Sequence, residues 1–168
     1  MKFFLIVIVF TFYFDCYAQT KFKTVVDEKK NQPMLIGVID RSNLMDSSFI
    51  HWFNEEYEYY AVDTTLVKTF KDELENVKIT IVMGTWCSDS RREVPHLLKI
   101  FDFLNFPKES YEIIAVDRKK QALIQIESLN IELVPTMIVY KSGNEIGRII
   151  ESPKETLEKD LEQIILND

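Results

Sequence analysis

The chain has 168 residues, of which 46% are apolar and 28% are charged, so it is long enough for one domain with a sizeable core. Its 20 Lys and Arg residues against 27 Asp and Glu give a formal net charge of -7, and no basic stripe interleaved with aromatic residues occurs. Nucleic acid is therefore not an expected partner.

The first 18 residues have the pattern of a secretory signal peptide. A basic Lys2 precedes an uncharged run from Phe3 to Phe14, and small or modest residues follow. This run is well short of the roughly 20 apolar residues that span a bilayer. We expect cleavage after Ala18 and export to the periplasm or an extracellular space, with no stable membrane span left in the mature protein.

Cleavage after Ala18 would remove Cys16 and leave Cys87 as the only cysteine. Lipid modification of Cys16 is the competing interpretation, but Phe14 and Asp15 stand where lipoprotein signals carry small or aliphatic residues. In an oxidising compartment a single cysteine has no partner within its own chain. Cys87 is therefore either inert and buried or reactive toward another molecule.

Residues 19–62 are expected to form an N-terminal extension before the main domain, residues 63–168. A polar stretch at 21–33 predicts a tether or an edge segment, and the apolar run at 34–40 suits a short strand. Apolar residues then recur at helical spacing over 47–60 and 63–74, which predicts two helices.

The main domain alternates strand and helix patterns. Residues 77–83 predict a strand that ends at Gly84, and apolar residues at three- and four-residue steps predict a helix running to about Leu104. Residues 111–117 and 119–129 repeat the order as a buried strand and a helix. This βαβ order predicts an α/β domain whose central strands lie parallel.

The end of the chain predicts a hairpin and one more helix. Residues 136–150 form two strand patterns around a Ser142-Gly143-Asn144 turn. The next segment predicts a helix with Ser152 as its cap, Pro153 in its first position and Glu155 three residues after the cap.

Several residues of this domain resemble the thioredoxin family. Trp86 and Cys87 lie in "WCSDS" at a strand-to-helix junction, and Pro95 follows eight residues after the cysteine, where the family's active-site helix is kinked. "VPT" at 134–136 stands where the family has its cis-proline, and "KSGNE" at the terminal hairpin. Together these features cover roughly residues 63–166.

The resemblance implies a thioredoxin-like fold, a central mixed sheet flanked by helices, here with an N-terminal helical extension. It also implies that Pro135 is a cis-proline facing Cys87. Val134, Pro135 and Thr136 would then bind the extended backbone of a partner, and Trp86 would shape its approach.

Two positions depart from the thioredoxin pattern. Ser90 replaces the second cysteine, so the site is C-x-x-S, which can attack a disulfide but cannot resolve the product itself. Ile81 replaces the buried acid that the family carries six residues before the first cysteine. An ordinary dithiol reductase is therefore not expected.

Cys87 can still be reactive because a thiol at a helix N-terminus meets unpaired backbone N–H groups and the positive end of the helix dipole. Ser90 and Arg91 would lie one turn further on, able to donate to the sulfur, although Ser90 is equally suited to capping. Arg92 and Glu93 are expected to be solvated. His96 lies too far along the helix to act as a base or to complete a metal site.

The first hypothesis is an exported thiol-disulfide oxidoreductase of monothiol type, with Cys87 as nucleophile and Ser90 and Arg91 steadying its charge. Its partners would be protein clients or low-molecular-weight compounds that carry thiols or disulfides, with no cofactor and no metal. The second hypothesis is a non-catalytic module that keeps the fold and the peptide-binding groove beside Pro135.

Overall fold

The computed structural model describes residues 21–167, so the predicted signal peptide and Cys16 lie outside the described residues. The strands of its one sheet are β1 (Phe22–Asp27), β2 (Gln32–Ile39), β3 (Val77–Met83), β4 (Tyr111–Ala115), β5 (Thr136–Lys141) and β6 (Asn144–Ile150). The α-helices are α1 (Ile50–Tyr59), α2 (Leu66–Thr69), α3 (Ser88–Leu104) and α4 (Leu157–Leu166). Short 3-10 turns are η1 (Arg41–Met45), η2 (Lys71–Leu74), η3 (Lys108–Ser110) and η4 (Glu127–Leu129).

The sheet has the strand order β1-β2-β4-β3-β5-β6. Strands β3 and β4 are parallel and are joined by α3, whereas β5 pairs antiparallel with β3 and with β6. At its centre Ile81 lies opposite Ile113 on one side and Met137 on the other. A mixed sheet with this crossover and terminal hairpin is the thioredoxin-like arrangement that the resemblance implied.

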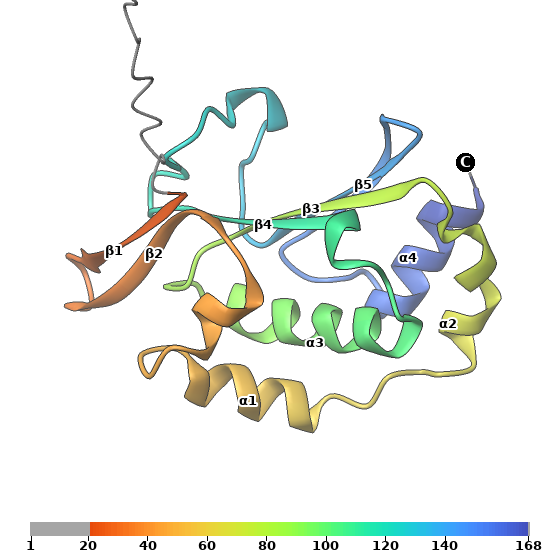
Figure 1. Ribbon diagram of the computed structural model, residues 1–168, viewed down its shortest axis with the longest axis horizontal. Helices are drawn as coiled ribbons and strands as arrows, with labels where there is room; N and C mark the ends of the chain where they lie inside the picture. The colour runs from red at the N-terminus through yellow and green to blue at the C-terminus, as the bar shows by residue number, and fades with distance from the viewer. Residues whose placement is uncertain (1–20, 168) are drawn as a thin grey trace, which may run out of the picture.

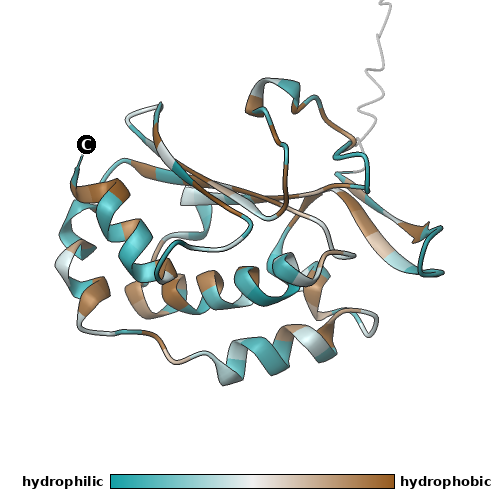
Figure 2. Ribbon diagram, turned by 180° about the vertical axis from the view of Figure 1, so that it is seen from behind, coloured by the Kyte–Doolittle hydropathy of each residue, from teal (hydrophilic) through white to brown (hydrophobic). Residues whose placement is uncertain are grey.

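The two faces of the sheet are covered differently. Figure 1 shows α1, α3 and α4 on one face, with the segment that follows β4 looping over the other. Because side chains alternate along a strand, Ile81 and Met83 enter the main core while Val82 packs with Ile114 and Ile126 in a smaller apolar cluster. Figure 2 shows the resulting hydrophobic character of the central strands.

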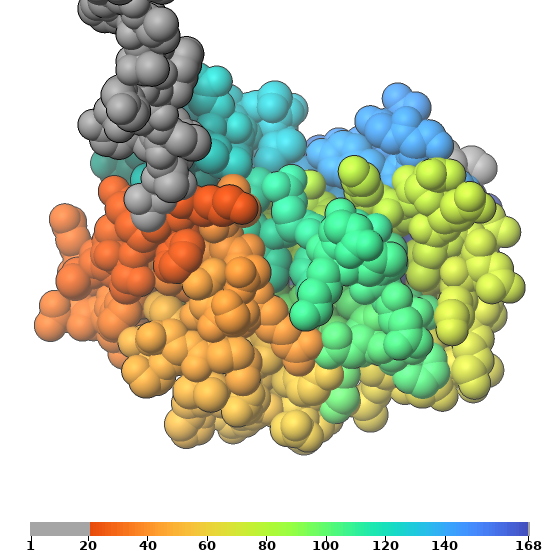
Figure 3. Space-filling view, in the orientation of Figure 1, coloured from red at the N-terminus to blue at the C-terminus, as the bar shows by residue number. Residues whose placement is uncertain are grey.

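The N-terminal extension is part of the same sheet and the same core. Strands β1 and β2 form a hairpin whose second strand pairs antiparallel with β4. The extension thus contains a two-stranded hairpin as well as helix α1, and the polar stretch at 21–33 holds its edge strand. The main core includes buried Leu35, Leu44, Phe49 and Phe53 from this region. In Figure 3 the extension, coloured red to yellow, forms one end and the lower side of the molecular surface.

The helix expected over residues 119–129 is wrong. The Asp117 carboxylate accepts hydrogen bonds from the amides of Lys119 and Gln121 at 2.8 and 2.9 Å, and Lys120 has a φ of 59°. Such local side-chain bonds offer the backbone an alternative to helix. Only the short turn η4 forms here, so β4 and β5 are joined by an irregular segment.

The hairpin prediction at Ser142 and Gly143 is confirmed, since β5 and β6 pair across these two residues. The expected start of the last helix is wrong, because α4 begins at Leu157 behind Thr156, whose hydroxyl accepts from the amide of Lys159 at 3.1 Å.

Among residues 21–167 no helix combines the length and the apolar character needed to cross a membrane.

Candidate active site around Cys87

Cys87 occupies the position that precedes the first turn of α3. Its backbone is extended, with φ −90° and ψ 130°, and its amide donates to the carbonyl of Gly84 at 2.9 Å. Its own carbonyl accepts from the amide of Arg91 at 3.1 Å, which starts the helix. The free thiol is partly exposed. The turn from β3 into α3 therefore places the sulfur at the N-terminus of a 17-residue helix.

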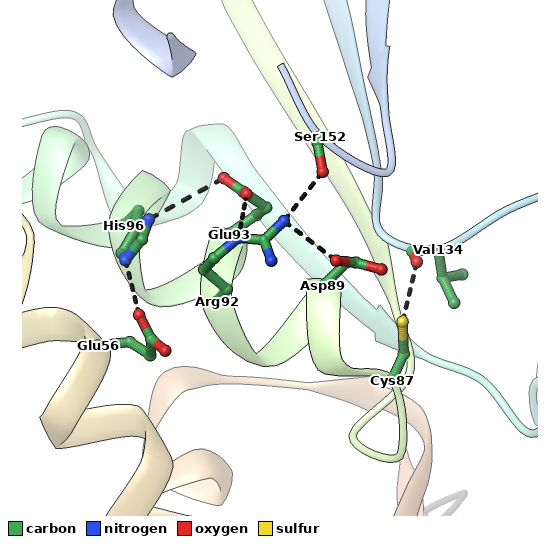
Figure 4. Close-up of polar contacts among 8 residues, drawn as sticks. All are labelled: Glu56, Cys87, Asp89, Arg92, Glu93, His96, Val134 and Ser152. Atoms are coloured by element: carbon green, nitrogen blue, oxygen red, sulfur yellow. Dashed lines mark hydrogen bonds and ion pairs between the residues drawn. The ribbon is translucent and has the colours of Figure 1, made fainter. Parts of the chain in front are cut away.

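The sulfur faces the loop that leads into β5. The Cys87 thiol donates to the carbonyl oxygen of Val134 at 3.1 Å, as Figure 4 shows. The peptide bond between Val134 and Pro135 is cis. The Pro135 carbonyl accepts from the amide of Glu151 at 2.7 Å, and the Thr136 hydroxyl donates to a loop carbonyl, that of Leu133. All three residues of the 134–136 segment are buried.

The hydroxyl of Ser90 makes no hydrogen bond to the sulfur of Cys87. Ser90 is fully buried, and its hydroxyl accepts from the amide of Gly84 at 3.1 Å. This bond closes the turn between β3 and α3, and it is not a helix cap, since no side chain caps the N-terminus of α3. This bond is neither of the two roles considered for Ser90, capping of the helix or donation to the sulfur, and it holds the backbone at Gly84 instead.

Arg91 turns back from the helix toward the same turn. Its Nε donates to the carbonyl of Thr85 at 2.6 Å, and its guanidinium lies 5.8 Å from the ring centroid of Trp52 on α1. Burial lowers the pKa of Arg91, and the neighbouring Cys87 acts in the opposite direction. The charged group is thus close enough to the thiol to interact with it electrostatically.

Three contacts hold the indole ring of Trp86, the residue that precedes Cys87. Its indole Nε1 donates to the carbonyl of Val116 at 2.9 Å, at the end of β4. Gly84 is needed for this placement, because a Cβ there would lie 2.6 Å from Cε2 of the indole. The guanidinium of Arg118 lies 4.7 Å above the ring, a cation–π contact.

An ion pair that the sequence did not reveal holds this arginine. Arg118 Nε and an Nη each donate to the Asp27 carboxylate at 2.7 Å. Asp27 ends β1 and is 2% exposed. The hydrogen bond from Arg118 lowers the pKa of Asp27 to about 2. The partners are 91 residues apart, so no spacing signal connects them.

The extension also holds the turn before Cys87. The buried Thr85 hydroxyl accepts from the amide of Leu35 on β2 at 3.1 Å. Together with the Asp27–Arg118 pair, this gives two links from the N-terminal hairpin to the residues around the thiol. The extension therefore helps to shape the site.

A second polar cluster runs along α3 away from Cys87. His96 Nε2 lies 3.0 Å from Glu56 on α1, and Arg92 contacts both Asp89 and Glu93. The expectation that Glu93 is solvated is wrong, since it is 6% exposed between Arg92 and His96. Burial lowers the pKa of His96. Figure 4 shows that this cluster joins α1 to α3 and does not reach the sulfur.

The described part of the chain brings together no group of three or more His, Cys, Asp or Glu residues able to hold a metal ion. The reactive group of this candidate site is the free thiol of Cys87. The helix N-terminus interacts favourably with a negatively charged sulfur, whereas the Val134 carbonyl binds the protonated form. Attack by the sulfur therefore requires it to leave that carbonyl.

No family model matches the sequence, and no curated protein matches it. Among solved structures, a protein of unknown function from Pseudomonas aeruginosa is 15% identical with a TM-score of 0.48, covering 77% of this chain and 89% of that one. Thioredoxin from Fasciola hepatica is 17% identical with a TM-score of 0.40, covering 61% and 89%. Mitochondrial thioredoxin 3 from Saccharomyces cerevisiae, oxidised form, is 19% identical with a TM-score of 0.39, covering 61% and 90%. Since these scores lie below 0.5, the fold assignment depends on the strand order and the crossover.

Proposed function

We propose that this protein is an exported thioredoxin-like monothiol oxidoreductase that exchanges disulfides through Cys87. The observation that carries the proposal is the place of the thiol. It lies at the start of a long helix, partly exposed, and faces the cis Val134–Pro135 bond. An inert cysteine would be expected inside the apolar core, where it fills space as a small hydrophobic side chain.

The exchange would take place in two displacements. The Cys87 thiolate, after losing its proton to solvent, attacks one sulfur of a client disulfide and forms a mixed disulfide, while the other client sulfur leaves as a thiolate. A thiol from a second molecule then attacks the client sulfur of the mixed disulfide and releases the Cys87 thiolate. Ser90 has no thiol to perform this second step, so the external thiol is required.

In this proposal Trp86 borders the approach to the sulfur, and Arg91 stabilises the thiolate charge. The backbone at Val134, Pro135 and Thr136 would position an extended client segment. Because the Val134 carbonyl accepts the hydrogen bond of the Cys87 thiol, a client that donates a backbone N–H to that oxygen would compete with the thiol for it. Client binding and release of the sulfur would then favour each other.

A non-catalytic binding module is the second candidate. The observation in its favour is that Ser90 donates no hydrogen bond to the sulfur and instead closes the turn at Gly84. Such a module would use the loop beside Pro135 and would need no thiolate.

The test uses the full chain carrying Cys16→Ser, so that Cys87 is the only thiol. The protein is mixed with a disulfide-containing peptide, quenched with acid and weighed intact, with and without a second thiol. We expect a mixed disulfide that the second thiol removes, and none in the Cys87→Ser variant. Full exchange activity in that variant would refute the proposal and favour the binding module.

Export is tested separately. When the full chain is produced in a bacterial host, we expect a mature protein that begins at Gln19, recovered outside the cytoplasm. Intact mass identifies the N-terminus. A lipid adduct on Cys16 would support the competing interpretation of the first 18 residues.

A further inference from the structure

Two arginines approach the Cys87 turn from separate elements. Arg91 belongs to the first turns of α3 and bonds the Thr85 carbonyl at 2.6 Å. Arg118 follows β4 and lies over Trp86 at 4.7 Å from the ring centroid. Each guanidinium packs on a tryptophan, which fixes its direction at a lower entropic cost than a free side chain would have.

Arg118 and Arg91 differ in their ion pairs. Arg118 is paired with the Asp27 carboxylate through two hydrogen bonds of 2.7 Å, so that pair has no net charge. No ion pair within residues 21–167 joins Arg91 to a carboxylate, and its hydrogen bond is to a neutral carbonyl. Arg91 therefore brings a positive charge to the turn without a directly paired carboxylate, and Asp27 attracts it only at longer range.

Asp89, on the same helix, makes its ion pair with Arg92 and not with Arg91. The carboxylate of Asp89 lies 3.0 Å from the guanidinium of Arg92, which also contacts Glu93. Figure 4 shows the guanidinium of Arg92 joined to Asp89, to Glu93 and to the hydroxyl of Ser152. The helix N-terminus adds partial positive charge at Cys87. Arg91 and the helix N-terminus thus both bring positive charge to the turn that presents the thiol, in a chain whose net charge is -7.

We propose that Cys87 reacts preferentially with disulfides that carry carboxylates close to the attacked sulfur, and that Arg91 provides this preference. The inference rests on the function proposed above and specifies its client. A negative group beside the reacting sulfur gains Coulomb energy from Arg91 in a partly buried setting, where solvent screens the pair less than at an open surface. The same chemistry is offered by a small anionic disulfide or by a protein segment with acidic residues beside its cysteine.

The experiment compares two aromatic disulfides on the full chain carrying Cys16→Ser. Dithiobis(nitrobenzoate) has a carboxylate on each ring, whereas dithiodipyridine is neutral at neutral pH. Both react with the same thiolate, so any change in the thiolate fraction cancels in the ratio of their rates. The ratio therefore reports the charge around the sulfur and not the reactivity of the sulfur.

We expect the anionic-to-neutral rate ratio to exceed that of the urea-unfolded chain. It should fall about threefold to tenfold in Arg91→Gln, a fraction of the range that electrostatic steering spans. Added salt should lower the wild-type ratio toward that of the variant because it screens the charge. Arg41→Gln is the matched control. Arg41 pairs with Asp102 near the far end of α3, so this variant should keep the wild-type ratio.

A second pair of reagents distinguishes the source of the carboxylate. Two disulfide-linked peptides differ only in having Glu or Gln on both sides of the cysteine. Faster reaction of the Glu peptide supports an acidic protein segment as the client, and a preference confined to the aromatic reagents supports a small anionic disulfide. An aromatic rate ratio no higher than that of the unfolded chain, together with equal rates for the two peptides, would overturn the inference.

The two proposals fail in different ways. High rates with a ratio that neither salt nor Arg91→Gln changes would overturn the charge preference and leave thiol exchange standing. Rates no higher than those of the unfolded chain with both reagents would overturn the proposed function itself. The salt series on the wild-type protein decides the first point even if Arg91→Gln does not fold.

Discussion

The hydroxyl of Ser90 accepts a hydrogen bond from the amide of Gly84 at 3.1 Å in a fully buried position. This one bond connects the last residue before the active-site turn to the first turn of α3. It explains how serine fits at the place where thioredoxins carry a second cysteine. The side chain here holds the backbone whose geometry presents Cys87.

Replacing Ser90 with Ala removes the acceptor and leaves the buried Gly84 amide unpaired. We expect the free energy of unfolding to fall by about 1–3 kcal/mol, the cost of an unsatisfied buried donor. Urea denaturation followed by circular dichroism measures it. Ser88→Ala is the control, since Ser88 is exposed and its loss should change stability by no more than about 0.5 kcal/mol. Equal effects of the two variants would contradict the assigned role.

Replacing Ser90 with Cys creates a C-x-x-C pair, with the second cysteine at a buried position one helical turn after Cys87. The introduced thiol can attack the mixed disulfide on Cys87 and expel the client. Intact mass after reaction with a disulfide peptide should then show an internal disulfide and little adduct, whereas the parent chain keeps the adduct. A persistent adduct in this variant would mean that position 90 is too far from the sulfur.

Replacing Gly84 with Ala should displace Trp86. The added Cβ would lie 2.6 Å from the indole Cε2, closer than real contacts, and overpacking of this kind costs about 1–3 kcal/mol. The indole would lose its bond to the Val116 carbonyl and its stack with Arg118. We expect a shift of tryptophan emission, measured in a Trp52→Phe background. Gly143→Ala, with nothing within 4 Å of the added carbon, should leave that emission unchanged.

Phe53 tests whether the extension supports the main core. It is 1% exposed on α1, and its ring packs with those of Trp52 and Tyr57. Replacing it with Ala should lower the free energy of unfolding by about 3–5 kcal/mol, and urea denaturation should remain a single transition. Tyr59→Ala, on the same helix but 86% exposed, should cost no more than about 0.5 kcal/mol.

The Asp27–Arg118 pair makes the stability of the folded protein depend on pH, and the sign of this dependence follows from the pKa of Asp27. The pKa of Asp27 is lowered from 3.8 to about 2, so the folded state favours the ionised form. Its contribution to stability is fully present above the ordinary value and is lost as the pH falls from there through about 2. The stability difference between the wild type and Asp27→Asn should therefore be constant near neutral pH and shrink in acid. A difference that grows in acid would exclude the pair as its cause.

The parts of the fold that could be predicted from the sequence are those with a local signal. The alternation in residues 77–83, the apolar period of α3 and the Ser142-Gly143 turn each depend on residues close together in the chain. The segment after Asp117 has helix-compatible apolar residues, but Leu123 and Ile124 are largely exposed while Ile126 packs on the sheet. The spacing of apolar residues along the sequence does not tell which of them face solvent.

The candidate site shows the same division. Cys87, Trp86 and Pro135 are candidates because of a family pattern, which is a sequence signal. Asp27 and Arg118 meet only because β1 and the end of β4 approach in the folded sheet, and nothing in either neighbourhood marks them. The start of α4 was misplaced because Asp160 bonds the amide of Lys154 at 2.8 Å and holds the preceding turn outside the helix.

The antiparallel pairing of β2 with β4 has a consequence for how the chain can be shortened. Without the hairpin, β4 would become an edge strand with a row of open N–H and C=O groups, the kind of edge on which other chains assemble into aggregates. In the intact protein the hairpin places β1 at that edge instead, with the charged Lys23 on it. A fragment that starts at residue 63 would therefore tend to self-associate, so the hairpin serves colloidal stability as well as the thiol.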